Sequence, residues 1–196
     1  MKVVGLTGGI ASGKSFVIAY LKKLKIPVHE SDEVVNLSYK NPTKKFINYL
    51  SECGFEKAIQ GKKINKKIIR EQIFANSVKK NKLEKFLHEK VNIKRSSFLK
   101  KNKRKKIIFL DIPLLFEKKM DKICDYICST VAPIKLRKSR ALQRKGMNKK
   151  VLNKIIEAQV KDALRKKRSN YLINTSKTKS LTCLQVDNII YDILKN

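Results

Sequence analysis

Short apolar runs alternate along the chain with stretches in which apolar residues recur at helical spacing. One of these runs, Lys106–Asp111, is continuously apolar and bounded by charge, as a central strand of a parallel sheet is. Lys14–Leu24 and Leu181–Leu194 carry helical stripes. Strands separated by helices predict a doubly wound α/β fold with a five-stranded parallel sheet and flanking helices. The five expected strands are Lys2–Thr7, Pro27–Ser31, Lys106–Asp111, Tyr126–Val131 and Tyr171–Ile173.

Two segments interrupt this alternation. Residues 43–103 show several helical stripes, such as the one through Phe46 and Leu50, and no convincing strand, so we expect a helical insertion. Residues 134–165 predict two helices joined near Gly146, a hinge that suits a mobile lid. The remaining segments, 1–42, 104–133 and 166–196, are expected to form the core.

Composition narrows the class of protein. The chain has 196 residues, of which 42% are hydrophobic, enough to bury a core in one domain with insertions. No apolar run approaches the roughly 18 to 20 residues that span a bilayer, and the first apolar stretch is too short for a signal peptide. We expect reduced thiols and a cytoplasmic location, because no C-x-x-C pair occurs among the four cysteines, Cys53, Cys124, Cys128 and Cys183.

The net charge of +31, from 47 basic and 16 acidic residues, invites comparison with nucleic-acid-binding proteins. However, the lysines are spread over the whole chain, and aromatic residues do not interleave with them as a base-stacking surface requires. We therefore expect no specific nucleic-acid function, although weak non-specific binding at low salt is expected. An anionic small-molecule substrate fits the charge equally well.

The strongest motif follows the first strand and precedes the first helical stripe. Its glycines let successive backbone N–H groups point at phosphate oxygens, and the next helix adds the positive end of its dipole. Lys14 is expected to reach the β- and γ-phosphates of a nucleoside triphosphate, and the Ser15 hydroxyl to ligate Mg²⁺. The motif reads Gly8-Gly9-Ile10-Ala11-Ser12-Gly13-Lys14-Ser15.

Two aspartates follow expected strands and each has two interpretations. Asp32 either accepts the proton of an attacking hydroxyl or caps a helix that starts at Glu33. Asp111 ends the central strand as a Walker B acid does and would bind Mg²⁺, or it caps the next turn. Their positions after strands place both near the edge where ligands bind in α/β sheets.

Three arginines, Arg137, Arg140 and Arg144, share one helical face because they are spaced i, i+3, i+7. Arginine makes bidentate contacts with phosphate and stabilises a phosphoryl group during transfer, but the same spacing suits a solvated basic face. His88, taken alone on its helical segment, suits a structural or surface position.

Together these motifs resemble the dephospho-coenzyme A kinase family over nearly the whole chain. The resemblance rests on Leu6–Ser15, on Asp32, on Pro113-Leu114-Leu115-Phe116-Glu117, and on Arg140 and Arg144 before Gln159. It implies a P-loop kinase fold in which residues 43–103 bind the coenzyme A precursor. It also implies transfer of the ATP γ-phosphoryl group to the ribose 3′-hydroxyl of dephospho-coenzyme A, with ATP and Mg²⁺.

The resemblance also implies roles for individual residues. Asp32 is the expected base, Lys14 and Arg140 act on the phosphates, and His88 matches a substrate-domain histidine. ATP contacts are expected from Gly8 through Ser15 and from Phe16 and Arg144; Leu114 and Leu115 are expected to line the acceptor.

The chain also departs from the family pattern, mainly at Glu30, Asn36 and Glu89, and the Asn36 departure affects one expected charged contact with substrate. Two alternatives stay open: another small-molecule P-loop kinase, of the nucleoside monophosphate or shikimate type, and a nucleic-acid-binding ATPase. We expect a monomer or a weak homo-oligomer.

Overall fold

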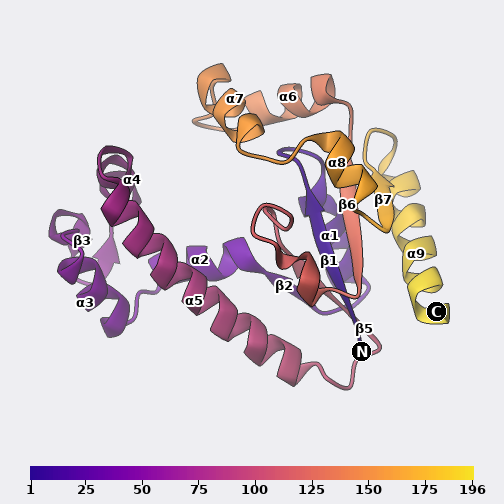
Figure 1. Ribbon diagram of the computed structural model, residues 1–196, viewed down its shortest axis with the longest axis horizontal. Helices are drawn as coiled ribbons and strands as arrows, with labels where there is room; N and C mark the ends of the chain where they lie inside the picture. The colour runs from indigo at the N-terminus through magenta and orange to yellow at the C-terminus, as the bar shows by residue number, and fades with distance from the viewer. The chain divides into compact units, whose positions relative to one another are not determined.

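A five-stranded sheet organises the chain, and the computed structural model describes residues 1–196. The strand order is β2-β5-β1-β6-β7, and β1 pairs in parallel with both β5 and β6, as β6 does with β7 (Figure 1). This confirms the predicted α/β class and all five expected strands. The strands are β1 (Lys2–Gly8), β2 (Val28–Glu30), β5 (Ile107–Asp111), β6 (Tyr126–Val131) and β7 (Tyr171–Asn174).

The register of β1 determines what meets at the carboxyl edge of the sheet. Leu6 lies opposite Asp111 on β5, and Gly8 lies opposite Thr130 on β6. Because parallel strands end at the same edge, the loop after β1 therefore begins between these two side chains.

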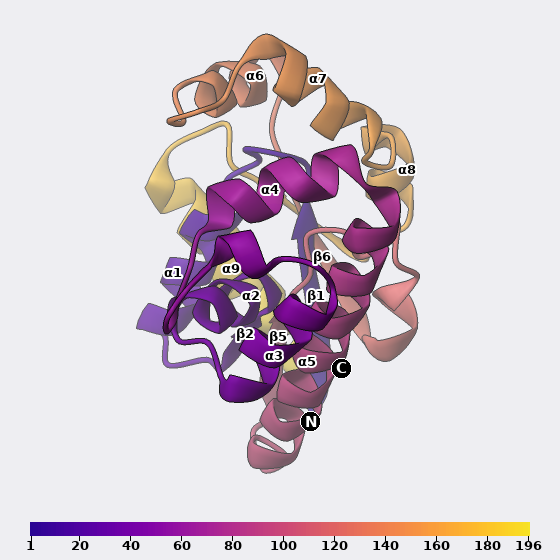
Figure 2. The same cartoon turned by 90° about the vertical axis from the view of Figure 1, so that its left-hand side faces the viewer.

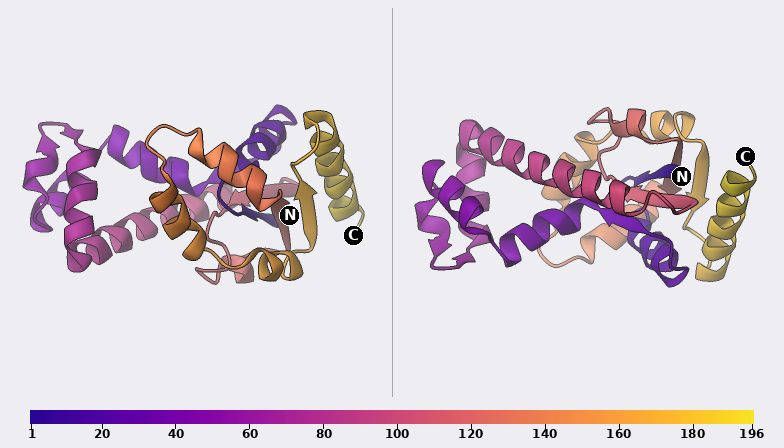
Figure 3. Two further views of the ribbon diagram at one scale, coloured as in Figure 1. Left: turned by 90° about the horizontal axis from the view of Figure 1, so that it is seen from above. Right: turned by 90° about the horizontal axis from the view of Figure 1, so that it is seen from below.

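Helices α1 (Lys14–Lys23) and α9 (Lys179–Lys195) pack on the sheet (Figures 1 and 3). Val17 and Leu21 of α1 and Ile193 of α9 are buried with Phe109 of β5 in one core cluster. Cys128 belongs to the same cluster, and burial raises the pKa of its thiol to about 12, which makes it an unreactive core residue. All four cysteines are free thiols.

Three helices, rather than the two expected, occupy the segment after β6 (Figure 2). The interruption before the third has a long-range cause: the Val160 amide donates to Glu117 Oε1 at 2.8 Å instead of to a helical carbonyl. Asn148 caps the second helix by accepting from the Val151 amide at 2.9 Å. The helices are α6 (Ile134–Leu142), α7 (Lys149–Glu157) and α8 (Asp162–Lys167); a 3-10 turn, Met120–Ile123, precedes β6.

Contacts divide the chain into two compact units, Met1–His29 with Asn102–Asn196, and Glu30–Lys101. The second unit has its own core, in which Phe46 and Phe86 stack with ring centroids 5.2 Å apart. Its helices, with the long α5 seen in Figure 3, are α2 (Ser31–Lys40), α3 (Lys44–Glu52), a 3-10 turn (Glu56–Ala58), α4 (Lys66–Ala75) and α5 (Ser77–Lys101).

The sequence expectations for this unit need two corrections. The unit contains a small antiparallel hairpin, β3 (Ile59–Gln60) with β4 (Lys63–Ile64), whose two-residue strands are too short to show a strand pattern. Helix α2 begins at Ser31 directly after β2, so Glu30 stands at the N-cap and Asp32 does not cap a helix.

The helical domain was expected to begin at residue 43. The second unit instead begins at Glu30, because α2 packs against α5. The predicted lid, residues 134–165, falls within the first unit; its treatment as a separate moving part stays a prediction. No helix has the length and apolar character needed to cross a membrane.

Candidate active site

The phosphate loop connects β1 to α1 and its backbone requires glycine. Gly13 has φ of 88°, in the left-handed region, and stands at the N-cap of α1. A Cβ atom at Gly13 would also lie 2.7 Å from Thr175 Oγ1. The Ser12 amide donates to the Gly9 carbonyl at 3.1 Å, which tightens the loop. The first-turn N–H groups of α1 and the positive end of its dipole therefore face the interior of the loop, where an anion binds favourably.

Lys14 and Asp111, the predicted phosphate-loop lysine and Walker B acid, form an ion pair at this loop. Asp111 is 3% exposed, at the carboxyl end of β5, and the Lys14 side chain is largely buried. Ser15, the next residue, is exposed in the first turn of α1. The structure thus places the lysine, the hydroxyl and the carboxylate of the predicted site at one edge of the sheet.

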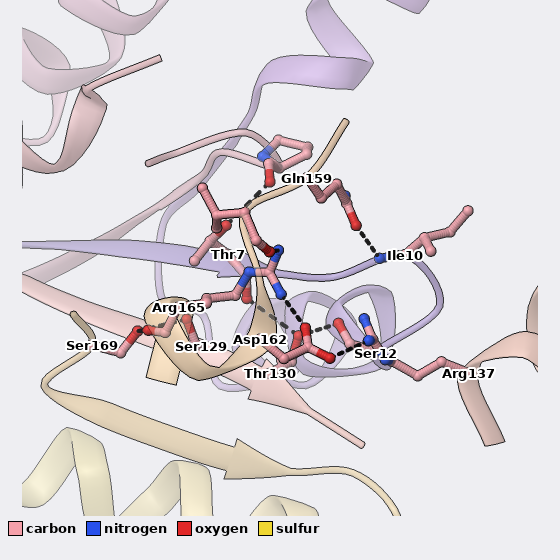
Figure 4. Close-up of polar contacts among 12 residues, drawn as sticks. Thr7, Ile10, Ser12, Ser129, Thr130, Arg137, Gln159, Asp162, Arg165 and Ser169 are labelled. Atoms are coloured by element: carbon pink, nitrogen blue, oxygen red, sulfur yellow. Dashed lines mark hydrogen bonds and ion pairs between the residues drawn. The ribbon is translucent and has the colours of Figure 1, made fainter. Parts of the chain in front are cut away.

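Buried hydroxyl groups on β6 and just after β7 hold the loop in shape, and Figure 4 shows the Thr130 contact with Ser12. Thr130 Oγ1 donates to the Thr7 carbonyl at 3.2 Å and lies 2.6 Å from Ser12 Oγ, so the Ser12 hydroxyl donates to Thr130. Thr175 Oγ1 donates to the Ser12 carbonyl at 2.7 Å. Sequence reasoning did not identify Thr130 or Thr175, and the loop depends on both for its polar support.

The variable positions of the loop contact the predicted lid. Ala11 is buried in a cluster with Ala141 and Leu152, against which Ile10 also packs. The Ile10 amide donates to Gln159 Oε1 at 3.0 Å (Figure 4). One loop N–H is therefore engaged by a side chain that follows α7, so the lid segment is tied to the loop by both apolar and polar contacts.

Glu117 anchors the segment that carries Gln159. Its carboxylate accepts from the Val160 amide and lies 4.0 Å from Arg165 Nη2. In the same motif Leu115 is fully buried, close to Gly5, whereas Leu114 is 37% exposed. Of the two leucines expected to line the acceptor, only Leu114 has side-chain surface available to a ligand.

Two buried arginines flank the loop at Gly9. Arg137 of α6 and Arg165 of α8 are 4% and 3% exposed, and both pair with Asp162 (Figure 4). A Cβ atom at Gly9 would overlap the Arg137 guanidinium, so only glycine permits this approach. Burial lowers the pKa of Arg137, and Arg165 lowers it further, while Asp162 raises it.

A cavity of about 340 Å³ lies beside these arginines at the carboxyl ends of β6 and β7. Its lining includes Thr130, Pro133, Arg137, Asp162, Arg165 and Lys166. Sequence reasoning missed Arg165 and Asp162. Arg165 begins a run of four basic residues, and Asp162 lies three residues before it. Their i, i+3 spacing was the available signal for a paired site.

The other arginines of the predicted face have different environments. Arg140 donates to the Thr175 carbonyl at 2.9 Å and to Thr175 Oγ1 at 3.3 Å, and is thus linked through Thr175 to the loop. Arg144 lies in the exposed turn beyond Leu142, where α6 ends, so the expectation that it shares a helical face with Arg137 and Arg140 was wrong. Asp32 and His88 belong to the second unit, on α2 and α5, and both are exposed. Phe16 is half-buried in the first turn of α1.

Comparison with known proteins identifies the family. The family model described as dephospho-CoA kinase matches residues 2–180. A protein named dephospho-CoA kinase from Bartonella quintana is 37% identical over 198 residues, with all of both chains covered.

Two solved structures have the same fold. The structure of TT1252 from Thermus thermophilus matches with a TM-score of 0.79 at 23% identity, covering 97% of this chain and 96% of that one. The dephospho-CoA kinase from Campylobacter jejuni matches with a TM-score of 0.73 at 22% identity, covering 100% of this chain and 98% of that one. The family model and the full-length relative show that the chain belongs to the dephospho-CoA kinase family, whose members are ATP-dependent kinases.

Proposed function

We propose that the enzyme transfers the γ-phosphoryl group of ATP to the ribose 3′-hydroxyl of dephospho-coenzyme A, giving coenzyme A and ADP. The observation that carries the proposal is the phosphate loop with Lys14 held at it by Asp111. Phosphoryl transfer needs the phosphates positioned and their charge offset, and this arrangement supplies backbone donors and an ammonium group together.

The ATP site in this proposal uses the loop from Gly8 to Phe16 for the phosphates and Arg140 and Arg144 from the lid. Mg²⁺ fits the residues present: the exposed Ser15 hydroxyl and the Asp111 carboxylate are oxygen donors, which Mg²⁺ prefers. Such a site takes its other oxygens from phosphate and water. It therefore needs no cluster of three acidic or histidine side chains, and the structure has none. Bound Mg²⁺ neutralises charge that develops on the phosphates.

For the acceptor, we propose Asp32 as the general base. It follows β2 by two residues, where a parallel sheet presents ligands, and its exposed carboxylate can accept a hydroxyl proton. His88 and Leu114 are proposed substrate contacts, and buried Leu115 supports Leu114 from the core. The free thiols fit the reducing cytoplasm, and we propose a monomer or weak homo-oligomer.

An acceptor screen with coupled ADP detection tests the proposal. Purified protein is supplied with ATP and Mg²⁺ and with dephospho-coenzyme A, shikimate or a nucleoside monophosphate in turn. We expect ADP release only with dephospho-coenzyme A, and a product phosphorylated at the ribose 3′ position. ADP release with another acceptor, or stimulated by nucleic acid alone, would overturn the proposed substrate.

Arg140→Ala is expected to lower kcat far more than it changes the affinity for the acceptor. The reason is that a lid arginine linked through Thr175 to the loop offsets charge that peaks in the transition state. Steady-state kinetics with dephospho-coenzyme A measures both quantities. Lys138→Ala, which removes an exposed charge from the same helix, is the matched control. An unchanged kcat in Arg140→Ala would mean that Arg140 only supports Thr175 and does not act on the phosphates.

A further inference from the structure

Arg137 and Arg165 are buried at one place, although arginine is seldom fully buried in proteins. They come from different helices, α6 and α8, and converge on Gly9 of the phosphate loop. A Cβ atom at Gly9 would meet both guanidinium groups, with Arg165 Nη1 at 3.2 Å. Two guanidinium groups therefore pack against Gly9, where the absence of a side chain leaves room for them.

The protein's own acceptors do not satisfy this pair of guanidinium groups completely. Asp162 accepts from both, with Arg165 Nη1 at 2.5 Å, and the Val160 carbonyl accepts from Arg165 Nη2 at 3.0 Å. Arg137 Nε is buried without a hydrogen-bond partner. A buried charged donor left without an acceptor is costly, so this atom points to an acceptor from outside the chain.

The surroundings show which kind of acceptor fits. Both arginines line the cavity of about 340 Å³ together with Lys166, so basic side chains outnumber acidic ones among the charged residues of its wall. Asp162 is the acid in this lining, and nearly half of its side chain is exposed to solvent. Guanidinium groups form bidentate, charge-assisted bonds with phosphate, and two of them beside a phosphate loop suit a polyphosphate.

We propose that Arg137 and Arg165 bind the β- and γ-phosphates of ATP beside Gly9 of the loop. The proposal rests on the proposed function, since it takes ATP as the ligand of the loop. It adds two phosphate-binding residues, Arg137 and Arg165, to the arginines assigned above. Asp162 holds the two guanidinium groups in place for this contact.

Titration calorimetry of the full chain with ATP and with AMP, both with Mg²⁺, tests the proposal. Arg137→Gln is expected to raise the Kd for ATP by roughly 10- to 100-fold, the range for losing a hydrogen bond to a charged group. AMP lacks the β- and γ-phosphates, so its Kd is expected to stay unchanged. Arg137→Lys keeps the charge but not the planar fork and is expected to recover part of the ATP affinity.

Arg168→Gln is the matched control. Arg168 lies just after α8, donates to Asp121 at 2.7 Å and stacks on Phe116, so its loss removes the same charge and a comparable ion pair. We expect wild-type ATP affinity from it. ATP binding by Arg137→Gln that equals the control, or equal losses for ATP and AMP with a lowered Tm, would make the pair structural and overturn the proposal.

The proposal can be tested with a second pair of variants, and it can fail separately from the proposed function. Should Arg137→Gln fail to fold, Arg137→Lys and Arg165→Lys provide the same comparison of ATP with AMP, and wild-type ATP affinity in both would overturn the proposal. ATP binding requires no acceptor, so a failed acceptor screen with intact ATP discrimination would refute only the substrate assignment.

Discussion

Lys14→Ala is expected to abolish turnover while leaving the protein folded. Lys14 pairs with Asp111 at the loop. In the proposed function its ammonium group contacts the phosphates and offsets the negative charge of the group in transfer. Losing one preorganised donor in an active site costs about 10² to 10³ in rate, and loss of a full charge is expected to reach at least the upper figure. Coupled ADP detection with dephospho-coenzyme A measures the loss, and a thermal melt measures folding.

Lys23→Ala is the control for this variant, because Lys23 is an exposed lysine in the last turn of the same helix. It removes the same net charge away from the loop, so we expect wild-type kcat. Wild-type kcat in a folded Lys14→Ala protein would show that the loop is not the site of phosphoryl transfer.

Asp32→Asn is expected to lower kcat by at least about 10²-fold, the lower end of what general-base assistance contributes. Asparagine keeps the shape and one acceptor oxygen but cannot take a proton. The affinity for ATP is expected to stay nearly unchanged, since Asp32 is assigned to the acceptor. Stability should fall by no more than about 1 kcal/mol, because Asp32 only places an acidic charge in the first turn of α2.

Steady-state kinetics, ATP titration and a thermal melt test these three expectations together. Glu33→Gln is the matched control, since Glu33 is also exposed in the first turn of α2. It should keep wild-type kcat and show a similar small change in stability. If Asp32→Asn remained fully active, Asp32 would have only the helix-dipole role.

Several features of this protein follow from the sequence alone because they are local. The phosphate loop occupies eight consecutive residues between an apolar strand and a helical stripe, so the pattern predicts both the loop and its position. Asp111 was predictable for a similar reason: a buried strand ends there, and parallel strands end at a common edge. The same local patterns identified all five strands of the sheet.

Tertiary structure alone decided which distant side chains complete the site. Gln159 reaches Ile10 across 149 residues, and Thr175 reaches Ser12 across 163, and no periodicity in the sequence connects positions so far apart. The interruption before α8, which brings Arg165 to the loop, likewise depends on Glu117 from another part of the chain.

The arginines of α6 show most clearly what the sequence determined and what the tertiary structure decided. The spacing of Arg137 and Arg140 correctly places these two on one side of a helix, but α6 ends at Leu142, so Arg144 does not share the predicted face. A helix rises about 1.5 Å per residue, so Arg137 and Arg140 are separated by about 4.5 Å along its axis. Packing of α6 against the loop brings Arg137 onto Gly9 and Arg140 onto Thr175, and leaves Arg144 exposed. The sequence determined that Arg137 and Arg140 share a face, and only the tertiary structure decided where the helix ends and which loop residue each arginine meets.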